Sequence, residues 1–319
     1  MKVTLHGVRG SIPSPLKNKE YKEKALEILH HFSHSSFSNT GDLKSFWQTL
    51  PPHLRYTAGG DTTCVSVVSD SGKTYVIDFG TGARSLGDDL VPKILSSKEN
   101  FILDVFITHT HWDHIQAIPF FKPIYFPNVT IRFHSPYQDL EDRLIRQMDK
   151  EYFPITFHST SSKKEFHLFQ PGDVLELEDG RVQVEVHPLK HPGNSYAYKF
   201  IENNKRFIFA TDAEFTGEDL EYIRGISTFF EKVELLVLDS QYTLDESFAK
   251  FDWGHTAYTM AVNIATQWKV KNLVLTHHEP AYDDKKVFGI WEEALEHKSH
   301  LHSSKVKIHL AREGMSFKI

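Results

Sequence analysis

The most informative segment of the chain is Thr108-His109-Thr110-His111-Trp112-Asp113-His114, which directly follows an apolar run that predicts a strand over residues 102–108. Alternation turns His109 and His111 to one side, while Asp113 and His114 face another. Imidazole and carboxylate groups are ligands that Zn²⁺, Mn²⁺ and Fe²⁺ accept. The alternative, a run of ordinary surface histidines, is disfavoured because this pattern seldom arises by chance at a strand end. The segment therefore predicts metal binding, with enough ligands to serve two ions.

Composition limits what surrounds this segment. The 319 residues are 40% apolar, which suits one large α/β domain over residues 1–319. A net charge of -6 gives no global basic field, so an extended nucleic acid is not an expected partner. The sequence shows neither a signal peptide nor a run of about 18 apolar residues, so we expect a cytoplasmic protein without a membrane partner. Cys64 is the one cysteine, which leaves nitrogen and oxygen ligands for any metal.

The remaining pattern alternates strands and helices. A helix interrupted by Pro119 is expected after His114, and turn signals at 179–180 and 203–204 indicate a β-meander over 165–209. Two halves, each with strands first and helices after, predict a four-layer αββα sandwich. The other predicted strands are 2–6, 63–69, 74–79, 235–239, 273–276 and 306–310, and the other predicted helices are 137–150, 216–230, 256–268 and 290–298.

A helical insertion is predicted at about 15–58. Apolar residues recur at helical spacing from Tyr21 to Phe32, and Asp42 to Leu50 suits a second short helix. We expect this insertion to act as a lid or as an oligomer contact, for instance in a homodimer.

The whole pattern resembles the metallo-β-lactamase superfamily. Two further segments are similar to the ribonuclease Z and cyclic phosphodiesterase branch of this superfamily: Gly7-Val8-Arg9-Gly10-Ser11-Ile12-Pro13 and Gly59-Gly60-Asp61-Thr62-Thr63-Cys64. The resemblance spans residues 1 to about 280. It implies that one metal is held by His109, His111 and His191 and the other by Asp113, His114 and His277. Asp212 would bridge the two metals, and Asp78 would orient ligands from behind. His278 competes with His277, which is preferred because it directly follows the strand end.

A second motif, Asp252-Trp253-Gly254-His255-Thr256, precedes a predicted helix. It resembles the His-Ser/Thr motif of ribonuclease Z and its relatives, in which the histidine assists phosphodiester cleavage. A helix N-terminus there favours an anion beside His255. The helix dipole would lower the pKa of His255, and the carboxylate of Asp252 is expected to offset this effect. The alternative is a simple helix-capping His-Thr pair. The candidate catalytic residues are therefore Asp78, Asp113, Asp252 and His255.

Two divalent cations, zinc first with manganese or iron as alternatives, would support hydrolysis by in-line displacement at phosphorus. The arm that grips transfer RNA in ribonuclease Z projects from between the positions matching His191 and Asp212, where this chain has 20 residues. We therefore expect a small phosphodiester, such as a cyclic nucleotide, as substrate. The alternatives are a ribonuclease Z-type endonuclease, a thioester or lactam hydrolase, and a metal-containing redox or sensory protein. Segments 15–58 and 120–160 are rich in aromatic residues, among them Phe120, Phe121, Tyr125, Phe126, Tyr152 and Phe153. Such residues more often belong to the core, and the alternative is that they form the wall of a pocket that stacks a base.

Overall fold

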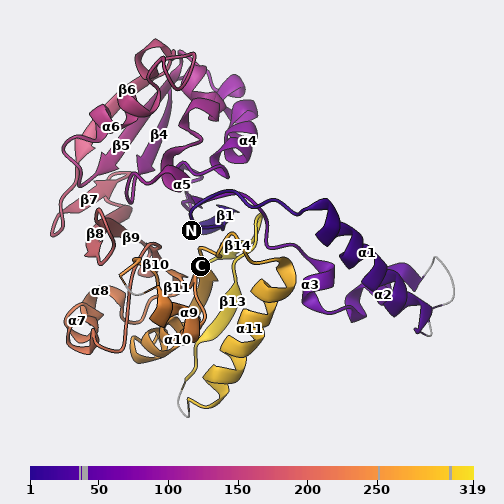
Figure 1. The fold of residues 1–319 in the computed structure, drawn as a ribbon. Helices are drawn as coiled ribbons and strands as arrows, with labels where there is room; N and C mark the ends of the chain where they lie inside the picture. The colour runs from indigo at the N-terminus through magenta and orange to yellow at the C-terminus, as the bar shows by residue number, and fades with distance from the viewer. Residues whose placement is uncertain (36, 38–41, 251, 302–303) are drawn as a thin grey trace.

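Two β-sheets face each other with helices on both outer sides, in the computed structural model of the chain (Figure 1). The structure describes residues 1–319 except 36, 38–41, 251 and 302–303. The predicted αββα sandwich is confirmed. The first sheet has the order β14 (Ser316–Lys318), β1 (Lys2–Gly7), β2 (Cys64–Val68), β3 (Thr74–Ile77), β4 (Phe101–Phe106), β5 (Val129–Ser135) and β6 (Lys163–Leu168). The second has the order β13 (Lys307–Leu310), β12 (Asn272–Thr276), β11 (Leu235–Asp239), β10 (Lys205–Ala210), β9 (Ser195–Glu202), β8 (Val182–Leu189) and β7 (Val174–Leu177).

Helices cover the outer face of each sheet. The α-helices of the described residues are α1 (Asn18–Ser33), α2 (Leu43–Thr49), α3 (Pro52–Arg55), α4 (Ala83–Ser96), α5 (Trp112–Ile115), α6 (Leu140–Gln147), α7 (Leu220–Gly225), α8 (Ser227–Phe230), α9 (Leu244–Ala249), α10 (Tyr258–Gln267) and α11 (Asp284–Ser299), of which α1 to α3 lie outside the sandwich. The two sheets meet through residues such as Val65 and Phe106 on one side and Phe200 and Val237 on the other. Separate apolar clusters lie under the helices of each outer face. Because the central strands are buried on both faces, they read as continuous apolar runs in the sequence.

The direction of the strands determines where functional side chains gather. Strands β3 to β6 run parallel, and so do β10 to β13. Parallel strands end at the same edge of a sheet, and ligands in open α/β sheets bind outside these carboxyl ends. The loops that leave β3, β4, β8, β10, β11 and β12 can therefore bring distant residues together at one edge of the sandwich.

The meander is shorter than the sequence suggested. Strands β7 to β10 pair antiparallel in order, but β6 pairs parallel with β5 in the other sheet, which corrects the predicted start at 165. Asn203 and Asn204, both at positive φ, join β9 to β10 as a two-residue hairpin turn. The 20 residues between His191 and Asp212 therefore contain this hairpin and no long arm.

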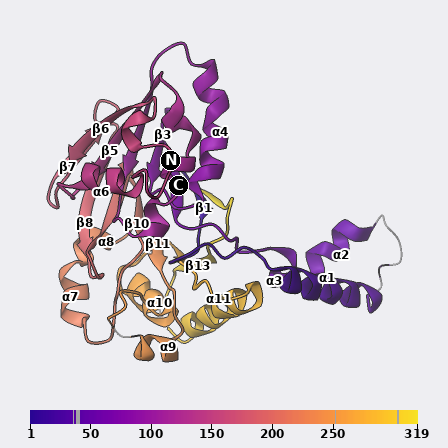
Figure 2. The ribbon, with the colours of Figure 1, turned by 45° about the horizontal axis from the view of Figure 1, so that its top comes forward.

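Residues 15–58 form a helical arm made of α1, α2 and α3, which extends away from the sandwich in both views (Figures 1 and 2). The arm has its own small core, in which Phe46, Leu50 and Leu54 pack with Ile28 and Phe32. An ion pair between Lys24 Nζ and Asp284 Oδ2, 2.8 Å long, joins α1 to α11. The arm therefore lies beside the body, and the lid that the sequence suggested is not the arrangement seen here.

Further elements differ from the sequence expectation. Helix α9 and strand β14 were not predicted, and the helix predicted over 216–230 is divided into α7 and α8. Strand β5 and helix α4 were not predicted, and the helix expected after His114 is the short α5, which begins inside the histidine-rich segment. Pro119 lies in a 3₁₀ turn beyond α5. No helix within the described residues is both long enough and apolar enough to cross a bilayer.

Candidate metal centre

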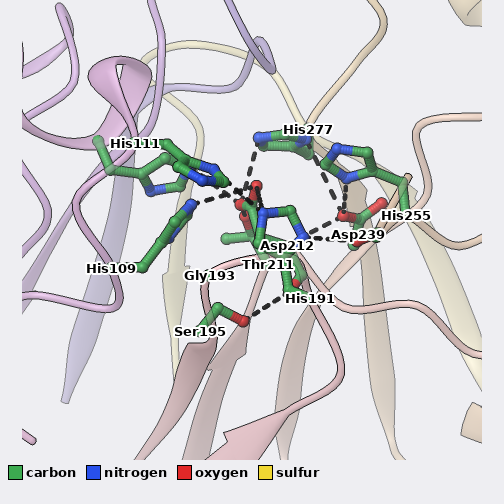
Figure 3. A network of polar contacts seen from close by, with 12 residues as sticks. His109, His111, His191, Gly193, Ser195, Thr211, Asp212, Asp239, His255 and His277 are labelled. Carbon is green, nitrogen blue, oxygen red and sulfur yellow. Dashed lines mark hydrogen bonds and ion pairs between the residues drawn. The ribbon is translucent and has the colours of Figure 1, made fainter. Parts of the chain in front are cut away.

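Seven side chains from four strand-end loops converge at one edge of the sandwich. Figure 3 labels five of them, which are His109, His111, His191, Asp212 and His277. His109, His111, Asp113 and His114 follow β4, and the others follow β8, β10 and β12. They form two groups whose ligand atoms lie within 4.8 Å of one another. The first group is His109, His111, His191 and Asp212, and the second is Asp113, His114, Asp212 and His277. The structure thus brings together all seven residues proposed as ligands, in the division that the resemblance implied.

Asp212 belongs to both groups, and each of its oxygens faces one of them. Its Oδ1 lies 3.6 Å from His109 Nε2 and 3.6 Å from His191 Nε2. Its Oδ2 lies 3.0 Å from His114 Nε2 and 3.3 Å from His277 Nε2. A carboxylate placed in this way can bridge two cations.

A second layer of groups fixes the orientation of these ligands. His114 Nδ1 lies 2.8 Å from Asp78 Oδ2, and Thr108 donates to Asp78 from both its backbone nitrogen and its hydroxyl. His191 Nδ1 donates to the Gly254 carbonyl at 2.9 Å. Each contact leaves Nε2 directed at the centre, as outer-shell partners of metal-binding histidines do. Asp78 therefore lies where the resemblance placed it, behind a ligand.

The opening Gly-Val-Arg-Gly-Ser segment also serves the centre. The backbone nitrogen of Ser11 donates to Asp113 Oδ2 at 2.7 Å. A Cβ on Gly10 would lie 2.5 Å from His277 Nδ1, so only glycine lets the backbone pass this close to the ring. The contact explains physically why glycine stands at position 10 of the Gly7–Pro13 segment, which was related to the ribonuclease Z branch only by resemblance.

Three site residues hold the left-handed backbone conformation that non-glycine residues rarely adopt. Asp78, Asp212 and His277 have φ values of 60°, 58° and 63°. Asp78 and His277 directly follow a strand, and Asp212 is the second residue after β10. Such residues cost about 1–3 kcal/mol each and persist where surrounding contacts hold them. Asp78 N donates to Phe106 O, and Asp212 N donates to Asp239 Oδ2. The sharp turns point Asp212 and His277 into the centre and direct Asp78 at His114 from behind.

The charges in the centre are strongly coupled. Burial opposes ionisation of Asp212, but His277, His114 and His109 outweigh it and hold the pKa of Asp212 well below its usual value. Burial also opposes protonation of His277, but Asp212 and its neighbours raise the pKa of His277 to about 9. In contrast, burial dominates at His109 and lowers its pKa well below the usual value. The two carboxylates Asp113 and Asp212 are thus acidic groups, with pKa values well below their usual range, surrounded by imidazoles.

The residues fit a pair of divalent cations. His109 Nε2 and His114 Nε2 are buried and have no hydrogen-bond partner within the described part of the chain. Such orphaned nitrogens are costly unless something binds them. The donor set of five imidazoles and two carboxylates suits Zn²⁺, Mn²⁺ or Fe²⁺. The seven residues would therefore hold a dinuclear divalent metal site.

Two expectations around His255 need correction. Helix α10 begins at Tyr258 with Ala257 as its N-cap, so His255 precedes the helix and is not part of its N-terminus. Asp252 is exposed, with its carboxylate 4.0 Å from Lys190 Nζ. The partner of His255 is Asp239, whose Oδ2 lies 2.7 Å from His255 Nδ1. Asp239 is fully buried at the end of β11, and the sequence reasoning did not single it out.

The choice between the two adjacent histidines is also resolved by their contacts. His277 Nε2 lies 3.3 Å from Asp113 Oδ2, inside the centre. His278 Nε2 lies 2.9 Å from the Ala311 carbonyl, away from it. The strand-end argument for His277 therefore agrees with the structure.

An αββα sandwich with a dinuclear site at its strand ends defines a metal-dependent hydrolase. The chain belongs to the family described as the β-lactamase superfamily domain, whose model matches residues 75–278. It is 24% identical over 233 residues to ribonuclease Z of Prochlorococcus marinus (strain NATL1A), covering 57% of this chain and 71% of the relative. These matches place it in the ribonuclease Z and phosphodiesterase branch.

Solved structures share the fold. The metallo-β-lactamase fold protein YhfI from Bacillus subtilis is 17% identical, with a TM-score of 0.63 and coverage of 99% of each chain. Unliganded yeast PDE1 is 15% identical, with a TM-score of 0.63, covering 100% of this chain and 99% of PDE1.

Proposed function

We propose that this protein hydrolyses a small phosphodiester, such as a cyclic nucleotide, with two divalent cations, of which zinc is the first candidate. The observation that carries the proposal is the His255–Asp239 pair beside the dinuclear site. His255 Nδ1 is 2.7 Å from Asp239, and the His255 ring stacks 4.9 Å from the ring of His277. A proton donor at the edge of a metal site is suited to a leaving alkoxide, and a thioester hydrolase needs such a donor less because a thiolate leaves readily without protonation.

Bound cations would supply an activated water and neutralise charge on the phosphoryl oxygens. The chain's own residues then have separate tasks. Asp239 accepts a hydrogen bond from the Nδ1–H group of His255. This leaves Nε2 of His255 to donate a proton to the leaving oxygen. Asp78 holds His114, and the Gly254 carbonyl holds His191, so that the ligands need little rearrangement when substrate binds.

Two observations support a small substrate. The β9–β10 hairpin occupies the place from which an RNA-gripping arm would project, and the net charge of -6 gives little attraction for a long polyanion. The second candidate function is RNA processing, which is favoured by the similarity to ribonuclease Z of Prochlorococcus marinus.

One experiment separates these functions. The purified chain is analysed for metals, loaded with Zn²⁺, Mn²⁺ or Fe²⁺, and assayed on bis-p-nitrophenyl phosphate, cyclic AMP, a transfer RNA precursor and a thioester. We expect phosphodiester hydrolysis, with cyclic AMP cleaved at least about tenfold more efficiently than the precursor. Faster cleavage of the precursor would favour the ribonuclease function. Hydrolysis of the thioester alone would overturn the proposal. Purified protein that contains iron and hydrolyses none of the substrates would overturn it as well. The cytoplasmic location and the homodimer stay predictions.

A further inference from the structure

An open pocket of about 800 Å³ lies beside the histidine-rich segment, between α5 and α6. Its volume is in the range of small-molecule binding sites. The lining residues that bear on its chemistry are Thr110, Trp112, Asp139, Arg143, Arg146, Gln147 and Tyr152. Thr110 and Trp112 alternate with the ligands His109 and His111, so the pocket and the metal centre share one segment of chain. Of the six aromatic residues that the sequence suggested for its wall, Tyr152 lines it, while Phe121 is in the core.

The pocket joins the open side of the metal centre through a chain of contacts. His111 is an exposed ligand, and a Cβ on Gly193 would lie 3.6 Å from its Nε2. Tyr137 donates its hydroxyl to the carbonyls of Gly193 and Asn194. The guanidinium of Arg143 stacks over the Tyr137 ring at 4.1 Å, and its Nη1 donates to Thr110 Oγ1 at 3.0 Å. Arg143 therefore stands at the boundary between pocket and centre.

Two large rings on the pocket wall are exposed. Trp112 is 80% exposed and Tyr152 is 77% exposed, although both are residues that folding usually covers. Flat, exposed aromatic rings beside cationic groups are the surfaces on which nucleobases stack.

The polar groups of the pocket favour an anion and an amine. Among the described residues, no carboxylate lies within ion-pair distance of Arg146. Arg143 is paired with Asp139 at 2.9 Å and with Thr110, and a guanidinium has five N–H donors, so it retains donors for a ligand. Gln147 donates from Nε2 to the Ile115 carbonyl, but its Oε1 is buried without a partner. A buried acceptor of this kind is satisfied by a ligand's amino group.

We propose that this pocket binds the nucleoside and second phosphate of a dinucleotide whose scissile phosphodiester lies at the metal centre. This inference rests on the phosphodiesterase function proposed above. The base stacks on Trp112 and Tyr152, its exocyclic amine donates to Gln147 Oε1, and Arg143 with Arg146 binds the second phosphate in the planar manner typical of guanidinium groups. A cyclic mononucleotide, which has a single phosphate, leaves the arginines without a partner.

The test measures binding by calorimetry, so that it does not depend on turnover. The probes are slowly hydrolysed phosphorothioate analogues of cyclic di-AMP, with two phosphates, and of cyclic AMP, with one. We expect the metal-loaded wild type to bind the dinucleotide at least about tenfold more tightly, and Arg146→Gln and Trp112→Leu each to remove most of this preference. Lys150→Gln removes the same charge close to α6 but outside the pocket lining, and is expected to keep the preference.

The outcomes separate this inference from the proposed function. If wild type hydrolyses cyclic AMP and cyclic di-AMP alike, and neither variant changes binding, the pocket assignment is wrong while the phosphodiesterase function stands. If wild type hydrolyses no phosphodiester but the preference depends on Arg146 and Trp112, the pocket assignment is supported and the hydrolytic function is wrong. Equal loss in Lys150→Gln would show a general charge effect and overturn the assignment.

Discussion

The Nδ1 atom of His255 lies 2.7 Å from Oδ2 of Asp239, and the same carboxylate accepts the backbone nitrogen of Asp212 at 3.1 Å. Buried Asp239 thus connects His255, the proposed proton donor, to Asp212, which faces both ligand groups. Asp239 Oδ1 also accepts the backbone nitrogens of Gln241 and Thr256. Asp239 Oδ2 also accepts the backbone nitrogen of Ala213 at 3.4 Å. Five hydrogen bonds at one side chain therefore restrict any movement of His255 relative to the centre.

Replacement of His255 tests its proposed role. His255→Gln is expected to lower kcat by about 10²- to 10⁴-fold, because general acid catalysis contributes about that factor. KM and the metal content should change little, since His255 is outside the seven-residue ligand set. Kinetics and plasma mass spectrometry of the same preparation measure both. Since His255, Asp239 and His277 could also hold an ion, loss of a metal in this variant would make His255 a ligand.

Asp239 and Asp252 distinguish the structural assignment from the one expected from the sequence. Asp239→Asn should reduce kcat, and the double variant with His255→Gln should be little worse than either single variant, because residues that act as one unit are not additive. Asp252→Asn should stay within about twofold of wild type, since its exposed carboxylate is 4.0 Å from Lys190. If Asp252→Asn lowered kcat more than Asp239→Asn did, Asp252 and not Asp239 would be the residue that acts with His255.

The ligands could be predicted because their chemistry is local, whereas Asp239 could not. Four ligands lie within six residues, and the others lie one or two residues beyond the ends of strands. Asp239 also ends a strand, but nothing along the chain shows that His255 lies beside it. Helix α4 was missed because it contains Gly87 and Pro92, and a Cβ on Gly87 would lie 3.0 Å from the Phe121 ring. Strand β5 was missed because the polar residues Arg132 and His134 interrupt its apolar run, and their partners Glu165 and Asp104 lie on neighbouring strands.

Metal content should depend on which ligand is removed. Asp212→Ala is expected to reduce binding from about two ions per chain to less than one, because Asp212 faces both groups. His111→Ala, which alters only the first group, should retain about one ion. Metal analysis after dialysis at defined free Zn²⁺ measures this. Equal stoichiometry in the two variants would contradict a shared Asp212.

The exposed apolar face of the helical arm predicts self-association. Leu26 and Leu29 on α1 are 56% and 63% exposed, and exposed apolar groups of this kind mark interaction surfaces. We expect the wild type to have twice the 36.8 kDa mass of one chain in light scattering, and Leu26→Glu with Leu29→Glu to be monomeric. Leu95→Glu on α4, a residue that is also exposed, is the matched control and should remain dimeric. A monomeric wild type would exclude the dimer.

The pH dependence of stability should contain a contribution from His6, far from the ligand set in the sequence. Burial lowers the pKa of His6 from 6.5 to about 4, with partial opposition from Asp89, and its Nε2 lies 2.8 Å from Ser66 Oγ. Between these two values the unfolded chain binds the proton and the folded chain does not, so stability is present above pH 6.5 and is lost as the pH falls toward 4. The full loss is at most roughly 3 kcal/mol. His6→Gln keeps a polar group for Ser66 but cannot titrate. The free energy of unfolding is measured in urea on metal-free protein. As the pH falls from 7 to 4, wild type should lose more of this free energy than His6→Gln does. Parallel curves would show that His6 is solvated in the native protein.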